Sequence, residues 1–240
     1  MKIKNLANYD LMSVEAADLI YSELISNPDL LFCGASGSSP LGTYKKLVEK
    51  YIVNVSVFKK LRLIKLDEWG GISMDDAQSC ETFLQQNIVK PLQLKSNQYI
   101  SFDSNPSDRV GECRRVGSYL QNNGPVDLCV LGLGLNGHVA FNEPASFLQP
   151  NCHVSDLSQA SLKHPMAINM SEKPTFGLTL GMADILQSRK ILMLVTGVGK
   201  SDVVKEFFSK KITPQLPASF LWLHPNVTCL VDNQFVGKIG

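Results

Sequence analysis

The sequence predicts an α/β fold, with a single domain built around a mostly parallel, open sheet that helices cover on both faces, as in Rossmann-like proteins. Short apolar segments alternate along the chain with longer segments of helical periodicity, which is typical of parallel strands joined by crossover helices. The apolar segments are continuous, as expected for strands buried on both faces. At 240 residues, of which 44% are apolar, the chain is long enough for one large core. We therefore expect one domain over residues 1–240.

The expected elements follow in order along this domain. The first is an N-terminal helix at residues 14–25. Buried strands are expected at residues 30–33, 61–66, 126–131, 191–195 and 227–231. Further helices are expected at residues 40–51, 80–89, 108–121 and 200–209. Residues 151–171 are polar and irregular, and we interpret them as a loop or a lid over the site.

Chemically versatile segments follow four of the expected strands. They lie at residues 36–39, at Asp67, at residues 132–143 and at residues 196–200. Ligands of open parallel sheets bind at the carboxyl ends of the strands. The four segments should therefore converge on one edge of the sheet, which predicts a single active site.

Charge and hydropathy exclude several classes of protein. A net charge of +1 gives no strong attraction to nucleic acid or to a membrane surface. No apolar run approaches the roughly 20 residues of a membrane span, and residues 1–5 lack the apolar core of a signal peptide. The six cysteines are scattered without a C-x-x-C pair, which favours buried, reduced thiols over a zinc site. We expect a cytoplasmic protein that acts on a small molecule and needs no metal; the sequence leaves open whether it forms a homo-oligomer.

The segment after the first expected strand has the features of an anion site. It consists of Ser36, Gly37, Ser38 and Ser39. Ser39 can cap the next helix and Pro40 suits its first position, so that free backbone N–H groups and the helix dipole would point at a phosphate. An ordinary capped helix start is the alternative. Lys200 would add a cation, but the nucleotide P-loop pattern requires a glycine where this chain has Leu194, which argues against a nucleoside triphosphate site.

The glycine-rich segment at residues 130–144 contains His138 and Glu143 within one turn. Its glycines, Gly132, Gly134 and Gly137, fit the dinucleotide pattern G-x-G-x-x-G. Asp156 lies about 20 residues further on, where that motif places its ribose-binding acid. The motif should open a long helix, however, and Pro144 would interrupt it. A tight turn around a hydrogen-bonded histidine and a catalytic loop are the other two interpretations.

His138 and two carboxylates are the candidates for proton transfer. Histidine titrates near neutrality, and Glu143 can orient the His138 ring and stabilise its charged form. Asp67 follows an apolar strand and lies close to Trp69, so partial burial would raise its pKa toward the working pH. A solvated acid in a turn is the alternative for Asp67.

Several segments, in the same order, resemble the glucosamine-6-phosphate and galactosamine-6-phosphate deaminase (isomerase) family. They are residues 36–44, 66–69, 132–146, 177–182, 194–200 and 223–225. The resemblance runs from about residue 30 to residue 232. It implies an enzyme that converts a 2-amino-2-deoxyhexose 6-phosphate, from glucosamine or galactosamine, to a ketohexose 6-phosphate and ammonia without a cofactor.

The resemblance also implies a role for each candidate residue. Asp67 would move a proton between C2 and C1 of the open-chain sugar, and His138 would open the ring. Glu143 would complete the relay of His138. Many members carry an acid where this chain has Asn136. An amide cannot balance the charge of an imidazolium, so the relay should depend more on Glu143.

Two departures from the family concern its anion sites. The arginine that clamps the phosphate falls near residues 161–165, where this chain has no arginine, and Lys163 or His164 would have to substitute. The basic residues of the regulatory site in allosteric members fall at residues 151–156, which here read Asn-Cys-His-Val-Ser-Asp. The chain also ends sooner after its last strand than those members do. The same activator is therefore not expected.

Two rival functions remain. A 6-phosphogluconolactonase is expected to carry a Ser-Leu-Phe-Pro-like run in place of residues 141–144, and Asp-Glu-Arg in place of residues 67–69. A sugar-phosphate sensor of a transcription regulator would carry a DNA-binding helix pair. This chain has Phe-Asn-Glu-Pro and Asp-Glu-Trp at those positions, and little room for a helix pair before residue 30.

Overall fold

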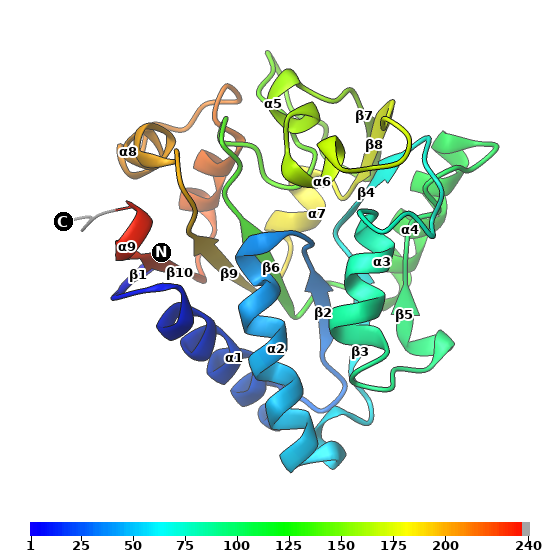
Figure 1. Ribbon diagram of the computed structural model, residues 1–240, viewed down its shortest axis with the longest axis vertical. Coiled ribbons are helices and arrows are strands. Elements are labelled where there is room, and N and C mark those ends of the chain that lie inside the picture. Colours follow the sequence, from blue (N-terminus) through cyan, green and yellow to red (C-terminus); the bar gives the residue numbers. More distant parts are fainter. Residues whose placement is uncertain (237–240) are drawn as a thin grey trace.

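The computed structural model describes residues 1–236 and is built on a seven-stranded parallel sheet (Figure 1). The strand order is β1-β10-β9-β6-β2-β3-β5. These strands are β1 Lys2–Leu6, β2 Leu31–Gly34, β3 Arg62–Lys65, β5 Tyr99–Ile100, β6 Leu128–Gly132, β9 Lys190–Val195 and β10 Val227–Asp232. The five predicted strands are confirmed as the five inner ones. The two edge strands, β1 and β5, were not predicted, because neither carries an apolar run.

Helices cover both faces of this sheet. One face packs against α1 Tyr9–Ser26, α2 Ser38–Val53 and α3 Cys80–Leu84, and the other against α4 Arg109–Asn123, α7 Met182–Leu186 and α8 Ser201–Phe208. Further helical segments are η1 Val55–Phe58, η2 Gln85–Val89, η3 Ser96–Gln98, η4 Pro217–Leu223 and α9 Asn233–Val236. Within β9, Leu192 and Leu194 pack into the core on the side of α1, α2 and α3, whereas Met193 and Val195 pack into the core on the side of α4, α7 and α8. The predicted α/β fold with a doubly covered parallel sheet is confirmed.

A second, antiparallel sheet forms above the carboxyl edge of the first. Its order is β4-β8-β7, with β4 Asp67–Gly70, β7 His153–Ser155 and β8 Phe176–Thr179. Only Leu66 separates β3 from β4, so the chain passes directly from the large sheet into the small one. Asp67, at the first position of β4, pairs with Thr179 of β8.

The segment at residues 151–171 is more regular than expected. It contains β7 and two short helices, α5 Gln159–Leu162 and α6 Pro165–Ile168. These elements have four residues or fewer, too short to produce a recognisable periodicity. The helices are specified by their caps, because the side chains of Ser158 and His164 accept hydrogen bonds from the first turns of α5 and α6.

The predicted convergence of four segments on one sheet edge is confirmed. Strands β9, β6, β2 and β3 are consecutive neighbours in the sheet. Residues 196–200, 132–143, 36–39 and Asp67 follow their carboxyl ends in that order. Across the described residues, no helix combines the length and the apolar character needed to cross a membrane.

Candidate active site

A cavity of about 330 Å³ lies at this carboxyl edge. The predicted residues that line it are Ser36, Gly37, Ser38, Ser39, Asp67, His138, His164 and Lys200. Asn136 and Glu143 contact each other next to His138. Lys163 is exposed and is not among the lining residues, so of the two candidates for the missing arginine only His164 faces the cavity.

Asp67 is a buried acid rather than a solvated acid in a turn. Only 9% of the residue is exposed. Burial and, to a lesser extent, the negative charge of Glu68 raise the pKa of its carboxyl, the positive charge of Lys65 opposes both effects, and the resulting pKa is about 7. A carboxyl with a pKa near neutrality can both accept and return a proton, as a general acid–base catalyst must.

Glu68, next to Asp67, has a structural role. It does not line the cavity. Its carboxylate contacts Lys65 Nζ at 2.6 Å and accepts hydrogen bonds from the backbone N–H groups of Cys80 and Glu81 at 2.9 and 2.7 Å. Lys65 Nζ also lies 2.8 Å from a carboxylate oxygen of Glu81. This network ties β3, β4 and the start of α3 together and so fixes the backbone at Asp67. Sequence analysis missed it, although a lysine and a glutamate three residues apart in an apolar run are its signal.

The glycine-rich segment seats the His138 ring. A Cβ atom on Gly134 would lie 2.4 Å from His138 Nε2, and one on Gly137, whose φ is +83°, would lie 2.1 Å from Leu216. Any side chain at Gly134 would displace the imidazole, and Gly137 needs the left-handed conformation that glycine favours. Residues 133–152 contain no helix. The dinucleotide interpretation is therefore wrong, because the glycines make room for a side chain instead of opening a helix.

Glu143 holds the other side of this ring. Its Oε2 lies 3.2 Å from His138 Nδ1 and accepts a hydrogen bond from Asn136 Nδ2 at 2.9 Å. Its Oε1 accepts a hydrogen bond from Ser161 Oγ. Burial alone would raise the pKa of Glu143, but the hydrogen bond and charge of His138, aided by Ser161 and Asn136, lower it to about 2. The carboxylate is thus ionised at working pH and can balance a positive charge on the imidazole.

The opposite wall has the features of an anion site. Helix α2 begins at Ser38, two residues earlier than predicted, with Gly37 at the N-cap position and a φ of +100°. The prediction that Ser39 caps this helix is wrong, because Ser39 lies within its first turn. The N-terminus of α2 carries no side-chain cap, so its first backbone N–H groups remain available to an anion.

Two basic side chains from other elements line the same cavity as this helix end. Lys200 precedes α8, forms no ion pair with any described residue, and has its pKa lowered to about 8 by burial. His164 Nδ1 accepts the backbone N–H of Met166 at 3.3 Å, which leaves Nε2 as the proton-bearing nitrogen. Burial, together with the charges of His138 and Lys200, lowers the pKa of His164. Both groups would gain charge stability from a bound anion.

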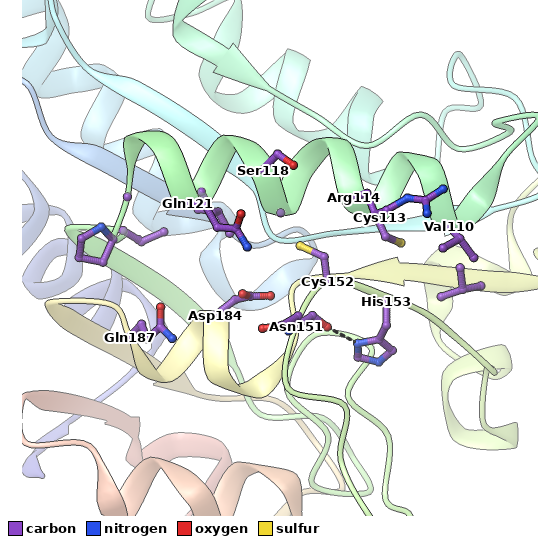
Figure 2. A pocket seen from close by; sticks show the side chains of 16 residues that line it. Val110, Cys113, Arg114, Ser118, Gln121, Asn151, Cys152, His153, Asp184 and Gln187 are labelled. Atoms are coloured by element: carbon purple, nitrogen blue, oxygen red, sulfur yellow. Dashed lines mark hydrogen bonds between the residues drawn. The ribbon is translucent and has the colours of Figure 1, made fainter.

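A larger cavity of about 930 Å³ lies elsewhere, between α4, β7 and α7 (Figure 2). Its charged side chains include Arg114 and Asp184, and Cys113, Cys152 and His153 also line it. None of the predicted site residues lies there. The smaller cavity is therefore the candidate active site, because it combines the buried acid, the histidine relay and the anion site.

Comparison with known proteins assigns the family. Residues 28–230 match the family described as glucosamine-6-phosphate isomerases/6-phosphogluconolactonase. The chain belongs to this family. It is 43% identical to the "Putative deaminase AgaI" of Escherichia coli (strain K12), over 96% of this chain and 91% of that protein. It is 35% identical to the glucosamine-6-phosphate deaminase of Geobacillus sp. (strain WCH70), over 100% of this chain and 96% of that protein.

Two solved structures are similar to this chain to different degrees. A monomeric glucosamine-6-phosphate deaminase superimposes with a TM-score of 0.93 at 30% identity, and the match covers 98% of each chain. The 6-phosphogluconolactonase from Leishmania guyanensis superimposes with a TM-score of 0.78 at 23% identity, over 97% of this chain and 96% of that one. The second likeness is one of fold alone.

Proposed function

We propose that the chain is an amino-sugar-6-phosphate isomerase and deaminase, organised as one domain over residues 1–240. Its substrate is a 2-amino-2-deoxyhexose 6-phosphate, glucosamine 6-phosphate or galactosamine 6-phosphate, and its products are a ketohexose 6-phosphate and ammonia. One observation carries the proposal: a buried aspartate with a pKa near 7 and a histidine held by an ionised glutamate line the same cavity as an anion site.

The phosphate binds at the N-terminus of α2. The first N–H groups of the helix and the hydroxyls of Ser38 and Ser39 supply neutral donors around it, and Ser36, whose hydroxyl donates to Cys80 Sγ, lines the same wall. Lys200 supplies the cation, and His164 takes the place of the family's arginine because its Nε2 is free to donate into the cavity. These groups bind the sugar through its 6-phosphate, at the end of the molecule remote from C1 and C2.

Ring opening falls to His138. Its Nδ1 is engaged by Glu143, which leaves Nε2 to exchange a proton with the ring oxygen. As that oxygen takes a proton and the C1 hydroxyl loses one, the hemiacetal opens to an aldehyde. The imidazole carries positive charge during the exchange, and the neighbouring Glu143 carboxylate stabilises it.

Isomerisation falls to Asp67. The aldehyde acidifies the C2 hydrogen, so the ionised carboxylate can remove it, and transfer of a proton from the substrate's ammonium group to the C1 oxygen leaves an enolamine. Asp67 then delivers the proton to C1, which converts the enolamine to an imine at C2. Water adds to the imine, ammonia leaves, and the ketone remains. The acidity of C2 comes from the substrate's own carbonyl, so these steps call for no metal or redox cofactor.

The two rival functions are less consistent with the site. Lactone hydrolysis leaves no role for a buried base near C2, and residues 141–144 and 67–69 differ from the pattern expected of a lactonase. A non-catalytic sensor has no need of an acid whose pKa is raised to about 7 or of a histidine relay.

The direct test is ammonia release from glucosamine 6-phosphate and galactosamine 6-phosphate, assayed side by side with formation of ketohexose 6-phosphate. We expect equal amounts of both products from at least one of the two sugars, and very little turnover of unphosphorylated glucosamine. Hydrolysis of 6-phosphogluconolactone without ammonia release from either amino sugar would support the rival enzyme and contradict the proposal.

A further inference from the structure

Helix α5 docks onto the histidine relay through two serines. Ser161 is 1% exposed, and its hydroxyl donates to Glu143 Oε1 while lying 3.4 Å from His138 Nδ1. The hydroxyl of Ser158 lies 3.4 Å from that of Ser161 and accepts a hydrogen bond from Asn136 Nδ2 at 3.3 Å. The backbone N–H of Ser158 also donates to Glu143 Oε1, at 3.4 Å.

These contacts close a ring around the Glu143 carboxylate. Oε2 contacts His138 and Asn136 of the glycine-rich segment, whereas the donors to Oε1, among the described residues, come only from α5 and its N-cap residue Ser158. A carboxylate whose two oxygens are engaged from opposite sides cannot rotate without losing hydrogen bonds on both sides. The orientation of Oε2 toward His138 therefore depends on what holds Oε1.

We propose that Ser161 is a positioning residue for the ring-opening step. Its hydroxyl holds Oε1 of Glu143 and thereby keeps Oε2 on His138 Nδ1, in a chain where Asn136 cannot supply a second charge. This inference rests on the proposed function. Ser161 lines the cavity, but it acts through Glu143 and not on the sugar, because its hydroxyl proton is already committed to the carboxylate.

The test is a double-mutant cycle on kcat for ammonia release. Ser161→Ala should lower kcat by about 10-fold to 100-fold, the range expected when a hydrogen bond to a charged group is lost. Ser161→Thr, which keeps the hydroxyl, should recover most of that loss. In the Glu143→Ala background, Ser161→Ala should have little further effect, because the group that it positions is gone.

Binding provides the second readout. Glucitol 6-phosphate has no ring to open, so its inhibition constant should be the same for wild type and Ser161→Ala. Ser155→Ala is the matched control: Ser155 also has a buried hydroxyl, but it donates to the Phe141 carbonyl, so its fold-change in kcat should multiply with that of Glu143→Ala. If Ser161→Ala does not fold, Ser161→Cys, which nearly preserves the shape and weakens the donor, replaces it in the same cycle.

Each outcome is decisive. A wild-type kcat in Ser161→Ala, or a loss that multiplies fully with that of Glu143→Ala, would overturn the positioning role. A wild-type enzyme that releases no ammonia from either amino sugar phosphate would instead overturn the proposed function, and that result is obtained before any variant is made.

Discussion

At the scale of single residues, Asp67 is the residue on which the proposed chemistry most depends. Asp67→Asn keeps the shape of the side chain but cannot accept the C2 proton. We expect kcat to fall by about 10²–10⁴-fold, the usual contribution of a general base, while glucitol 6-phosphate still binds. In the wild type, kcat/KM should fall as the pH drops through about 7, because protonation of Asp67 removes the base. A near-normal kcat for Asp67→Asn would exclude Asp67 from this role.

The contacts around His138 predict that substitutions of Glu143 and Asn136 lower kcat to different extents. Glu143→Gln removes the charge that balances a protonated His138, whereas Asn136→Ala removes one of several donors to that charge. We expect a clearly larger loss of kcat from Glu143→Gln, with KM nearly unchanged in both variants. Steady-state kinetics at one pH is sufficient for the comparison. The reverse order would mean that Asn136 and not Glu143 sustains the histidine.

The lowered pKa of Lys200 predicts how phosphate binding depends on pH. Burial lowers the pKa of its ammonium to about 8, so the cation is present below this pH and is lost above it. The inhibition constant of glucitol 6-phosphate, which carries no amine of its own, should therefore rise as the pH is raised through 8. In Lys200→Ala the constant should be higher throughout and should lack this rise. An unchanged profile in Lys200→Ala would place the phosphate elsewhere.

The residues that the sequence identified are those whose chemistry is local. His138, Glu143 and Asp67 stand out because they are polar and follow apolar strands. Ser161, by contrast, lies in a polar segment where a serine is unremarkable, and only the tertiary contact with Glu143 distinguishes it. The choice between Lys163 and His164 also needed the structure, because the orientation of a short helix decides which neighbour faces the cavity.

At the scale of elements, the passage from β3 to β4 positions the catalytic acid. Lys65 at the end of β3 is fully buried among Glu68, Glu81 and the Phe102 carbonyl. Lys65→Ala would leave two carboxylates without their cation, and breaking a buried pair in this way costs about 3–5 kcal/mol. We expect a lower urea midpoint at an unchanged slope. Lys46→Ala, which removes an exposed ion pair with Glu49, is the matched control and should leave the midpoint almost unchanged.

The same passage shows why some elements escaped prediction. The inner strands are apolar on both faces and are visible in the sequence, whereas β4, β7 and β8 have three or four residues each and depend on pairing with one another. The predicted helix at 80–89 likewise divides into α3 and the π-helical turn η2. Local periodicity carries no information about such pairing or about a change in helical pitch.

At the scale of the whole molecule, the parallel sheet brings distant segments together. Residues 36–39, Asp67, residues 132–143 and Lys200 share one edge because their strands are neighbours in the sheet. The alternation of strands and helices predicted this convergence, since the rule that places ligands at carboxyl ends needs only the fold class. The likeness in fold to a 6-phosphogluconolactonase shows that the scaffold alone does not decide the chemistry.

The central claim is that a carboxylate in this cavity removes the proton from C2 of an amino sugar phosphate. The most direct measurement uses glucosamine 6-phosphate and galactosamine 6-phosphate labelled with deuterium at C2, with the product analysed by NMR. We predict that ammonia is released together with a ketohexose 6-phosphate and that the deuterium is divided between C1 of this product and water, because a proton held by a carboxylate exchanges with solvent. Ammonia release with formation of an aldose 6-phosphate that keeps deuterium at C2 would mean that the amine is displaced without removal of that proton, and would contradict the account.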